Sequence, residues 1–294
     1  MMQYGITLLN TGTGSDARIL AELAQEAEEA GWDGVFLWDC IYIEETLGSD
    51  GRVACDPWIA LAAIAMRTER VRLGPMVTPL SRRRPWKVAR ETVTLDHLSR
   101  GRLVLAVGLG FIDDGGYSKV GEELDRKARA QMLDEALAIL DGLWSGQPFS
   151  FKGEHYHVEE MTFLPTPVQR PRIPVWVVGV WPYMKSMRRV LAWDGVIPAT
   201  HGDDGSFFGK MTPADLQAMQ TFLAEQRART TPFDIVVEGE TPGDDPEQAR
   251  SIVRPLAEAG VTWWLEAVYG TPETQGGVEG MRARIRQGPP RPIS

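Results

Sequence analysis

The stretch from Asp56 to Phe111 constrains the fold most strongly, because it alternates helical and strand periodicity. Apolar residues three or four positions apart predict helices over residues 58–66 and 86–98. Runs rich in β-branched residues predict strands over 71–78 and 103–110. This alternation is typical of parallel sheets, in which ligands bind beyond the carboxyl ends of the strands. The search for a functional site therefore starts at those ends.

The same alternation extends along the whole chain and gives eight strand–helix pairs. Further strands are predicted over 3–10, 34–39, 175–178, 194–200, 234–240 and 261–269. Further helices are predicted over 15–31, 132–143, 213–226, 246–259 and 281–287. Ser15 is the expected cap of the first of these helices, and Pro182 suits the first turn of a helix after the fifth strand. The fold class is therefore α/β, a (β/α)8 TIM barrel of the usual size of roughly 250 residues, with a small hairpin (149–158) inserted before strand 5. Residues 1–294 are interpreted as one domain that ends in a C-terminal tail, 288–294.

Composition excludes several classes of function. The net charge of −9 argues against a nucleic-acid or anionic-membrane partner, since both require a basic surface. No apolar run approaches the roughly 20 residues that span a bilayer. Two cysteines make no disulfide framework, and no His, Cys or carboxylate set has metal-ligand spacing. We expect a cytoplasmic protein without a metal, whose partner is a small-molecule substrate.

One basic cluster, Arg82-Arg83-Arg84, stands out within this acidic chain. It either forms a solvated loop or meets a phosphate, and the sequence leaves both alternatives open. Nucleophile-elbow and Walker motifs are missing, and the Gly-x-Gly at Gly108–Gly110 lacks the third glycine of a dinucleotide-binding loop. An α/β-hydrolase is therefore disfavoured, and a Rossmann domain is excluded.

Candidate chemical groups follow several of the predicted strands. Asp39 ends the second strand and is expected to contact cofactor or substrate, whereas His201 follows the sixth strand and is a candidate general acid or base, or a loop histidine. Trp38 belongs to a set of aromatic residues at strand ends that either line a pocket or pack the barrel. Glu238 and Glu266, near the ends of the last two strands, either orient substrate or form ion pairs.

Several sequence blocks resemble the luciferase-like flavin-dependent oxidoreductases, which include bacterial luciferase-like monooxygenases and their deazaflavin-dependent relatives. Each block is weakly specific, but their order and spacing together are more specific, and the resemblance covers roughly residues 3–270. The blocks are Ala27–Asp33 (AEEAGWD), Thr68–Gly74 (TERVRLG), Leu95–Arg102 with Gly108–Gly110, the Phe151-x-Gly153-x-His155 hairpin, and Pro174–Gly179 followed by Asp194-Gly195.

The resemblance implies a homodimeric barrel whose strand ends hold FMN or the deazaflavin coenzyme F420. In this family the isoalloxazine leans on a bulge at the end of the third strand, often with a cis non-proline peptide, which maps onto Met76-Val77 with Thr78 next. The cofactor phosphate would meet backbone N–H groups after the fifth strand. The candidates for this contact are Gly179, Val180 and Trp181. Further cofactor-binding candidates after the fourth strand are Gly108, Gly110 and Asp114.

Two departures from the family pattern bear on the mechanism. Many relatives have Asp-His at the end of the second strand, where this chain has Asp39-Cys40. Deazaflavin dehydrogenases of the family often carry a proton-donating Glu directly after Gly-x-Gly, where this chain has Phe111. Their sugar-phosphate mechanism is therefore not carried over, and Cys40 and Phe111 are expected to line the substrate pocket.

The resulting expectation is a flavin-dependent oxidoreductase, a monooxygenase type that uses reduced FMN on a small organic substrate. FMN is favoured over the deazaflavin coenzyme because Phe111 replaces the glutamate of the deazaflavin branch. The alternatives are a deazaflavin-dependent reductase or dehydrogenase, a barrel that binds flavin without turnover, and a cofactor-free barrel. Asp39 and His201 are the candidate catalytic residues.

Overall fold

The computed structural model describes residues 2–46, 49–50, 52–111, 115–200, 209, 211–228, 231–269 and 277–291. The chain forms two compact units. Unit 1 consists of Met1–Thr7, Glu26–Val35 and Pro174–Ser294, and unit 2 of Leu8–Gln25 and Phe36–Ile173. No helix among the described residues is both long and apolar enough to cross a membrane.

The strand topology is that of a TIM barrel, as the sequence predicts. Within the described residues, nine strands are hydrogen-bonded in the order β5-β2-β1-β13-β12-β11-β10-β7-β6, and the helices alternate with them along the chain. The predicted third strand forms two strands, β5 (Arg72–Pro75) and β6 (Thr78–Pro79), because the chain bends at Met76-Val77. A separate two-stranded sheet, β8 (Pro148–Lys152) and β9 (His157–Thr162), is the predicted hairpin before β10.

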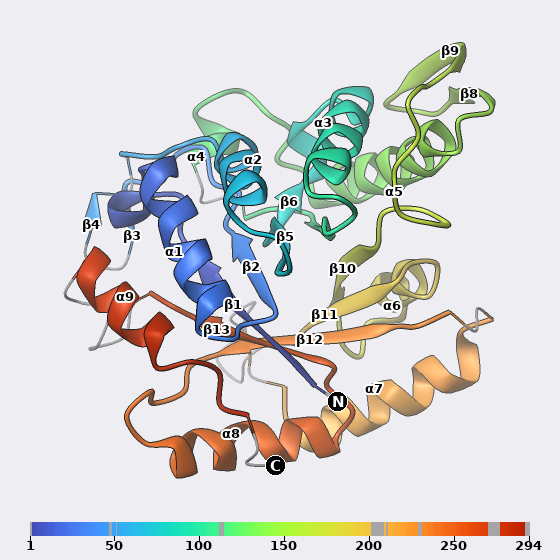
Figure 1. Cartoon of the computed structure of the whole chain (residues 1–294). Coiled ribbons are helices and arrows are strands. Elements are labelled where there is room, and N and C mark those ends of the chain that lie inside the picture. The colour runs from blue at the N-terminus through green and yellow to red at the C-terminus, as the bar shows by residue number, and fades with distance from the viewer. Residues whose placement is uncertain are drawn as a thin grey trace. The chain divides into compact units, whose positions relative to one another are not determined.

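Unit 1 carries five parallel strands (Figure 1). They are β1 (Gln3–Leu8), β10 (Val175–Val180), β11 (Gly195–Ala199), β12 (Asp234–Gly239) and β13 (Trp263–Ala267). Their helices are α6 (Met184–Val190), α7 (Pro213–Gln226), α8 (Pro246–Glu258) and α9 (Val278–Arg286). The registers place Trp176 and Trp263 on one face of this sheet, where their rings lie 5.5 Å apart and fill the core.

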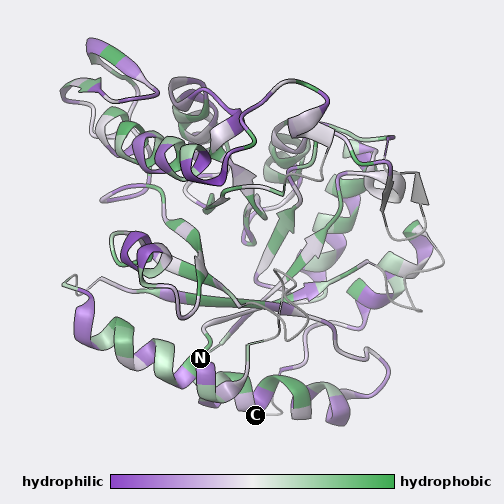
Figure 2. Cartoon of the chain, turned by 180° about the vertical axis from the view of Figure 1, so that it is seen from behind, coloured by the Kyte–Doolittle hydropathy of each residue, from purple (hydrophilic) through white to green (hydrophobic). Residues whose placement is uncertain are grey.

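Unit 2 contains the remaining strands of the barrel and most of the loops that follow them. The strands of the barrel in this unit are β5, β6, β7 (Leu105–Gly108) and β2 (Gly34–Leu37), the last of which begins in unit 1. A separate small pair consists of β3 (Glu45–Thr46) and β4 (Ser49–Asp50). The helices are α1 (Ala17–Glu29), which also spans both units, α2 (Pro57–Arg67), α3 (Pro85–Leu98), α4 (Gly115–Ser118) and α5 (Arg126–Trp144), with 3-10 turns η1 (Gly12–Gly14) and η2 (Leu80–Arg82). Figure 2 shows that the strands of the barrel are largely hydrophobic, whereas the β8–β9 hairpin is largely hydrophilic and the long helices alternate hydrophobic and hydrophilic residues.

Three local expectations differ from the structure. At the start of α1, Asp16 rather than Ser15 accepts a hydrogen bond from a helical amide, that of Arg18, at 2.8 Å. Pro182 precedes α6 and follows a cis peptide bond instead of lying in its first turn. The described part of the predicted tail, 288–291, contacts unit 1, since the Arg291 guanidinium pairs with Asp33 at 2.7 Å.

Candidate functional site

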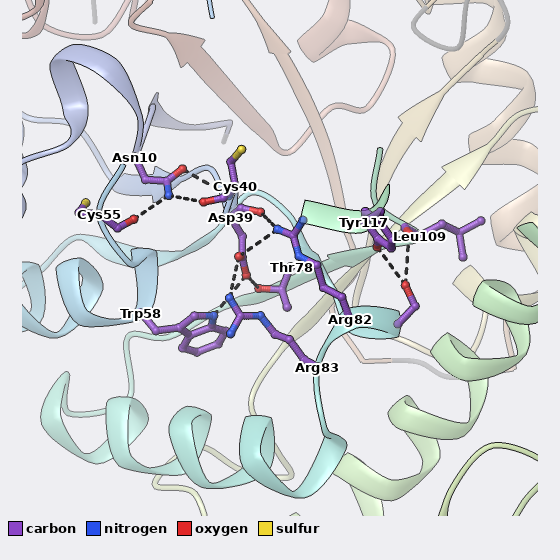
Figure 3. Close-up of polar contacts among 11 residues, drawn as sticks. Asn10, Asp39, Cys40, Cys55, Trp58, Thr78, Arg82, Arg83, Leu109 and Tyr117 are labelled. Carbon is purple, nitrogen blue, oxygen red and sulfur yellow. Dashed lines mark hydrogen bonds and ion pairs between the residues drawn. The ribbon is translucent and has the colours of Figure 1, made fainter. Parts of the chain in front are cut away.

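Asp39, at the carboxyl end of β2, is the centre of a buried polar network in unit 2 (Figure 3). Its Oδ2 accepts hydrogen bonds from Thr78 Oγ1 at 2.8 Å and from Trp58 Nε1 at 3.3 Å. Its Oδ1 accepts from Arg83 Nη2 at 2.7 Å and pairs with Arg82 Nη2 at 3.5 Å. Arg82 also donates to the Asp39 backbone carbonyl. Four donors therefore occupy the carboxylate, which offers about four lone-pair positions in total.

The basic cluster of the sequence is thus only partly a solvated loop. The Arg82 side chain is 0% exposed and that of Arg83 is 18% exposed, because both turn inward onto Asp39. Arg84 is exposed. A paired, hydrogen-bonded carboxylate is the condition under which a guanidinium can be buried at acceptable cost. The network therefore fixes the end of β2 against η2, α2 and β6.

The bend between β5 and β6 has the geometry that the resemblance implies. The Met76-Val77 peptide bond is cis. Met76 is buried and its amide donates to Leu37 O at 2.6 Å, whereas the Val77 side chain is partly exposed. Thr78, which follows directly, is the residue that hydrogen-bonds Asp39. The bend and the end of β2 are therefore joined by direct contacts.

Gly110, the second glycine of the Gly-x-Gly after β7, packs against Tyr117. Gly110 has φ +79°, and a Cβ there would lie 2.1 Å from Tyr117 Oη. Tyr117 Oη donates to Leu109 O at 2.8 Å, and the guanidinium groups of Arg82 and Arg129 lie 5.4 and 5.2 Å from the centre of its ring. Burial raises the pKa of Tyr117, so the phenol stays neutral. Arg129 Nη1 donates to Leu109 O at 2.8 Å.

In unit 1, the candidate phosphate-binding amides after β10 already have partners. Val180 N donates to Ser186 Oγ at 3.0 Å, and Trp181 N donates to Ala199 O at 2.8 Å. A Cβ at Gly179 would lie 2.8 Å from Val190 Cγ2, so this glycine faces packed side chains. The position of Ser186 near the start of a helix suggests that its hydroxyl accepts a hydrogen bond from a backbone amide. No sequence signal indicates that this amide is that of Val180.

The two glutamates near the ends of β12 and β13 lie on opposite faces of the sheet. Glu238 is in register with Leu265, and successive strand residues alternate faces, so Glu238 and Glu266 point away from each other. Glu266 is buried on the helix side, where its carboxylate lies 3.2 Å from Arg284 of α9. It also accepts hydrogen bonds from Thr241 N at 2.6 Å, Thr241 Oγ1 at 2.7 Å and Trp264 Nε1 at 2.9 Å.

These contacts engage both carboxylate oxygens of Glu266 without a ligand. Burial raises the pKa of Glu266, and the Arg284 charge and three hydrogen bonds oppose that rise. Glu238, in contrast, is exposed on the other face and accepts a hydrogen bond from Tyr269 Oη at 2.7 Å. Of the two, Glu238 is the one placed where a ligand can reach it.

The remaining candidates follow β2 or β7 or lie outside the described residues. Cys40 is buried next to Asp39, and Asn10 holds its backbone carbonyl at 2.8 Å. Trp38 is partly exposed, and Phe111 is 50% exposed. Asp114 and His201 lie outside the described residues. Among the residues that the structure describes, no group of three or more His, Cys, Asp or Glu side chains could hold a metal ion.

The chain belongs to the luciferase-like monooxygenase family, whose model matches residues 2–287. It is 30% identical over 264 residues to an F420-dependent glucose-6-phosphate dehydrogenase of Nakamurella multipartita, covering 88% of this chain and 71% of that protein. Alignments with several other relatives of that name span about half of those proteins. The protein is therefore an oxidoreductase of this family.

Solved structures show the same fold. An F420-dependent secondary alcohol dehydrogenase in complex with an F420–acetone adduct superposes with a TM-score of 0.76 at 18% identity, covering 97% of this chain and 98% of the other. A monooxygenase from Streptomyces bottropensis superposes with a TM-score of 0.74 at 20% identity, covering 97% of each chain. At these identities the likeness concerns the barrel alone.

The residues present fit the coenzymes of the family in part. The interruption between β5 and β6, where Val77 is partly exposed, lies where the resemblance places the isoalloxazine ring. The amides of Val180 and Trp181 do not form an open phosphate cradle, since both donate within the chain. The ring site at Met76-Val77 therefore stays a prediction, and the described amides after β10 assign no phosphate site.

Proposed function

We propose that this protein is a deazaflavin-dependent dehydrogenase or reductase that acts on a small organic substrate. The observation that carries this proposal is the 30% identity, over 88% of this chain, to a relative that is an F420-dependent dehydrogenase. It reverses the expected preference for FMN and a monooxygenase, which rests on Phe111 alone. One substituted residue is weaker support than similarity over most of the chain.

The coenzyme, when bound, supplies the hydride chemistry, and the protein supplies binding and orientation. Met76 and Val77 would support the ring from the bend between β5 and β6, and Thr78 keeps that bend in contact with Asp39. Because four donors fix its carboxylate, we assign Asp39 a positioning role rather than proton transfer. Trp38, Cys40 and Phe111 are proposed to line the substrate side, where Phe111 offers apolar contact area.

The substrate is proposed to differ from the sugar phosphate of that relative. Cys40 and Phe111 stand where the family pattern has a histidine and a glutamate for that chemistry. The phenyl ring of Phe111 has no proton to transfer, so it cannot take the place of that glutamate. We therefore propose a neutral alcohol or carbonyl compound as the substrate class.

Parallel fluorescence titrations of the purified protein with FMN and with the deazaflavin coenzyme test the proposal. We expect saturable binding of the deazaflavin at least about tenfold tighter, a difference of about 1.4 kcal/mol. The reverse preference would restore the FMN-dependent monooxygenase. Binding of both without turnover would indicate a silent flavin-binding barrel, and binding of neither a cofactor-free barrel.

A further inference from the structure

Two segments of unit 2 that follow neighbouring parts of the barrel are joined at their bases. The first segment, residues 40–56, follows β2, and the second segment, residues 111–125, follows β7. Arg82, just after β6, connects them (Figure 3). Its guanidinium pairs with Asp39, the residue before the first segment, and lies 5.4 Å from the ring centre of Tyr117 in the second segment. The two segments therefore start close together.

A second connection joins the segments further along the chain. Lys119 Nζ pairs with Glu44 Oε1 at 2.6 Å and lies 4.6 Å from the centre of the Tyr42 ring. A Cβ at Gly115 would lie 2.4 Å from Tyr42 Cδ1, so this ring packs directly against the backbone of α4. Because they are held at two places, the two segments act as one structural unit at the strand ends, where barrels bind ligands.

Three large apolar side chains of the joined segments are exposed. Ile41 directly precedes Tyr42, Val120 directly follows Lys119, and Phe111 begins the second segment. Ile41 and Phe111 are each 50% exposed, and Val120 is 57% exposed. Apolar side chains that gather at one place on a surface typically mark a site that another apolar group covers. The joined segments therefore offer a binding surface for an apolar group.

The bend at Met76-Val77, where the coenzyme ring is proposed to bind, lies between the strands that lead into these segments. Met76 N donates to Leu37 O of β2 at 2.6 Å, and Thr78 of β6 is in register with Val107 of β7. A substrate that reaches a ring at this bend therefore lies next to the segments that follow β2 and β7. The part of the substrate away from its reacting carbon is the group that these segments can contact.

The charge of the two segments disfavours other occupants. Residues 40–56 and 111–125 together contain nine acidic residues and two basic ones, Arg52 and Lys119. A second copy of the chain, docked by this face around a two-fold axis, would bring the same acidic segments together. Anionic lipids and anionic substrates are repelled for the same reason. An uncharged apolar group is therefore the occupant that both the side chains and the charge favour.

From these contacts we propose that the joined segments bind an apolar substituent of the substrate, an inference that rests on the proposed function. Ile41, Phe111 and Val120 are the specificity-determining residues. The substrate class is thereby narrowed to uncharged alcohols and carbonyl compounds that carry an aliphatic chain or an apolar ring. Polyols and carboxylates of similar size are selected against, the first by the apolar side chains and the second by the acidic segments.

The first test measures binding to the chain without coenzyme. The Ile41 δ1-methyl signal, assigned as the one that Ile41→Val removes, is followed by NMR during titration with straight-chain 1-alkanols from butanol to decanol. We expect the affinity to rise about two- to fourfold with each added CH2, because each one leaves water on binding. Alkanoates of the same lengths at pH 8 should bind at least about tenfold more weakly. An affinity that does not depend on chain length, or an Ile41 signal that does not shift, would overturn the inference.

Substituted chains make the same test specific to this surface. Phe111→Ser should weaken the binding of 1-octanol by at least about tenfold, whereas Met161→Ser, at a 44% exposed residue of β9, is the matched control and should not. Since all of these side chains are exposed, the substitutions leave the core intact. An equal effect of Met161→Ser would overturn the assignment. Conversion of a dimer to a monomer by Ile41→Ser/Phe111→Ser in light scattering would show that a second copy covers the surface, and would also overturn it.

The second test measures turnover of the coenzyme-loaded protein with the same alcohols. We expect kcat/KM to rise with chain length, and the rise to be smaller in Ile41→Ser/Phe111→Ser because KM increases most for the longest alcohols. Turnover that does not depend on chain length would overturn this inference alone. Binding that depends on chain length, without deazaflavin-dependent turnover of any alcohol, would overturn the proposed function and with it the identification of the bound group as part of a substrate.

Discussion

At the residue scale, Arg102 joins three segments at the end of the barrel opposite to the candidate site. Its Nε and both Nη atoms donate five hydrogen bonds, to the carbonyls of Ser99, Val71, Ala65 and Thr68 and to the Thr68 hydroxyl, at 2.7–3.0 Å. A lysine ammonium offers three donors without the planar fork, so carbonyl groups would lose their partner. We expect Arg102→Lys to lower the free energy of unfolding by about 3 kcal/mol, measured by urea denaturation. The exposed Arg100→Lys is the control, and an equal stability of the two variants would contradict the assignment.

Gly110 gives a second prediction at this scale, because two effects disfavour a side chain there. Its φ of +79° disfavours L-residues, and its Cβ would collide with Tyr117 Oη. Gly121 has φ +75° with nothing within 4 Å, so Gly121→Ala isolates the effect of φ. We expect Gly110→Ala to unfold more easily than Gly121→Ala by about 1–3 kcal/mol in thermal and urea unfolding. Tyr117→Phe should reduce that difference, because it removes the colliding atom.

At the scale of elements, Glu135 of α5 attaches the β8–β9 hairpin to its helix. Its carboxylate accepts from the amides of Glu154, His155 and Tyr156 in the hairpin turn, at 2.7–3.3 Å. A Cβ at Gly153 would lie 2.3 Å from Glu135 Oε2, which explains the glycine of the hairpin block.

We therefore expect Glu135→Ala to speed hydrogen exchange across residues 148–162 while the exchange of the barrel strands stays unchanged, as measured by mass spectrometry. The exposed Lys127→Ala on the same helix is the control variant. Unchanged exchange in the hairpin of Glu135→Ala would show that the carboxylate does not hold it.

The elements that the sequence predicts well are those with local signals. The bounds of α7 agree with the expected 213–226, since Thr212, Pro213 and Asp215 form a proline-started capping box that is visible in the sequence. The burial of Arg82 and Arg83 could not be predicted, because their partner Asp39 lies more than forty residues away. The Val180 amide fails for another reason: its acceptor, the Ser186 hydroxyl, is only six residues away, but no sequence motif pairs the two.

At the scale of the molecule, the position of the candidate groups is predictable but their roles are not. Alternating strands and helices place Asp39, Met76 and Glu238 at strand ends, and the structure confirms these positions. The periodicity of a strand assigns Glu238 and Glu266 to opposite faces, yet it does not tell which face is covered by helices. The contact between Glu266 and Arg284 identifies the helix side of the sheet. Glu266 therefore belongs to a buried ion pair, whereas Glu238, which accepts a hydrogen bond from Tyr269, lies on the opposite face.

The exposed face of α2 leads to the last prediction, which concerns assembly. Ile59 and Met66 are 69% and 70% exposed, and Ala62 and Ala63 lie between them at helical spacing. Such a stripe on a helix is typical of a surface that another protein covers. Since the family resemblance implies a homodimer, we propose that a second copy of the chain covers it. Light scattering should then give a dimer for the unmodified protein and a monomer for Ile59→Lys/Met66→Lys, with the exposed Ile252→Lys on α8 as control. A monomeric unmodified protein, or a double variant that remains dimeric, would exclude this face as the interface.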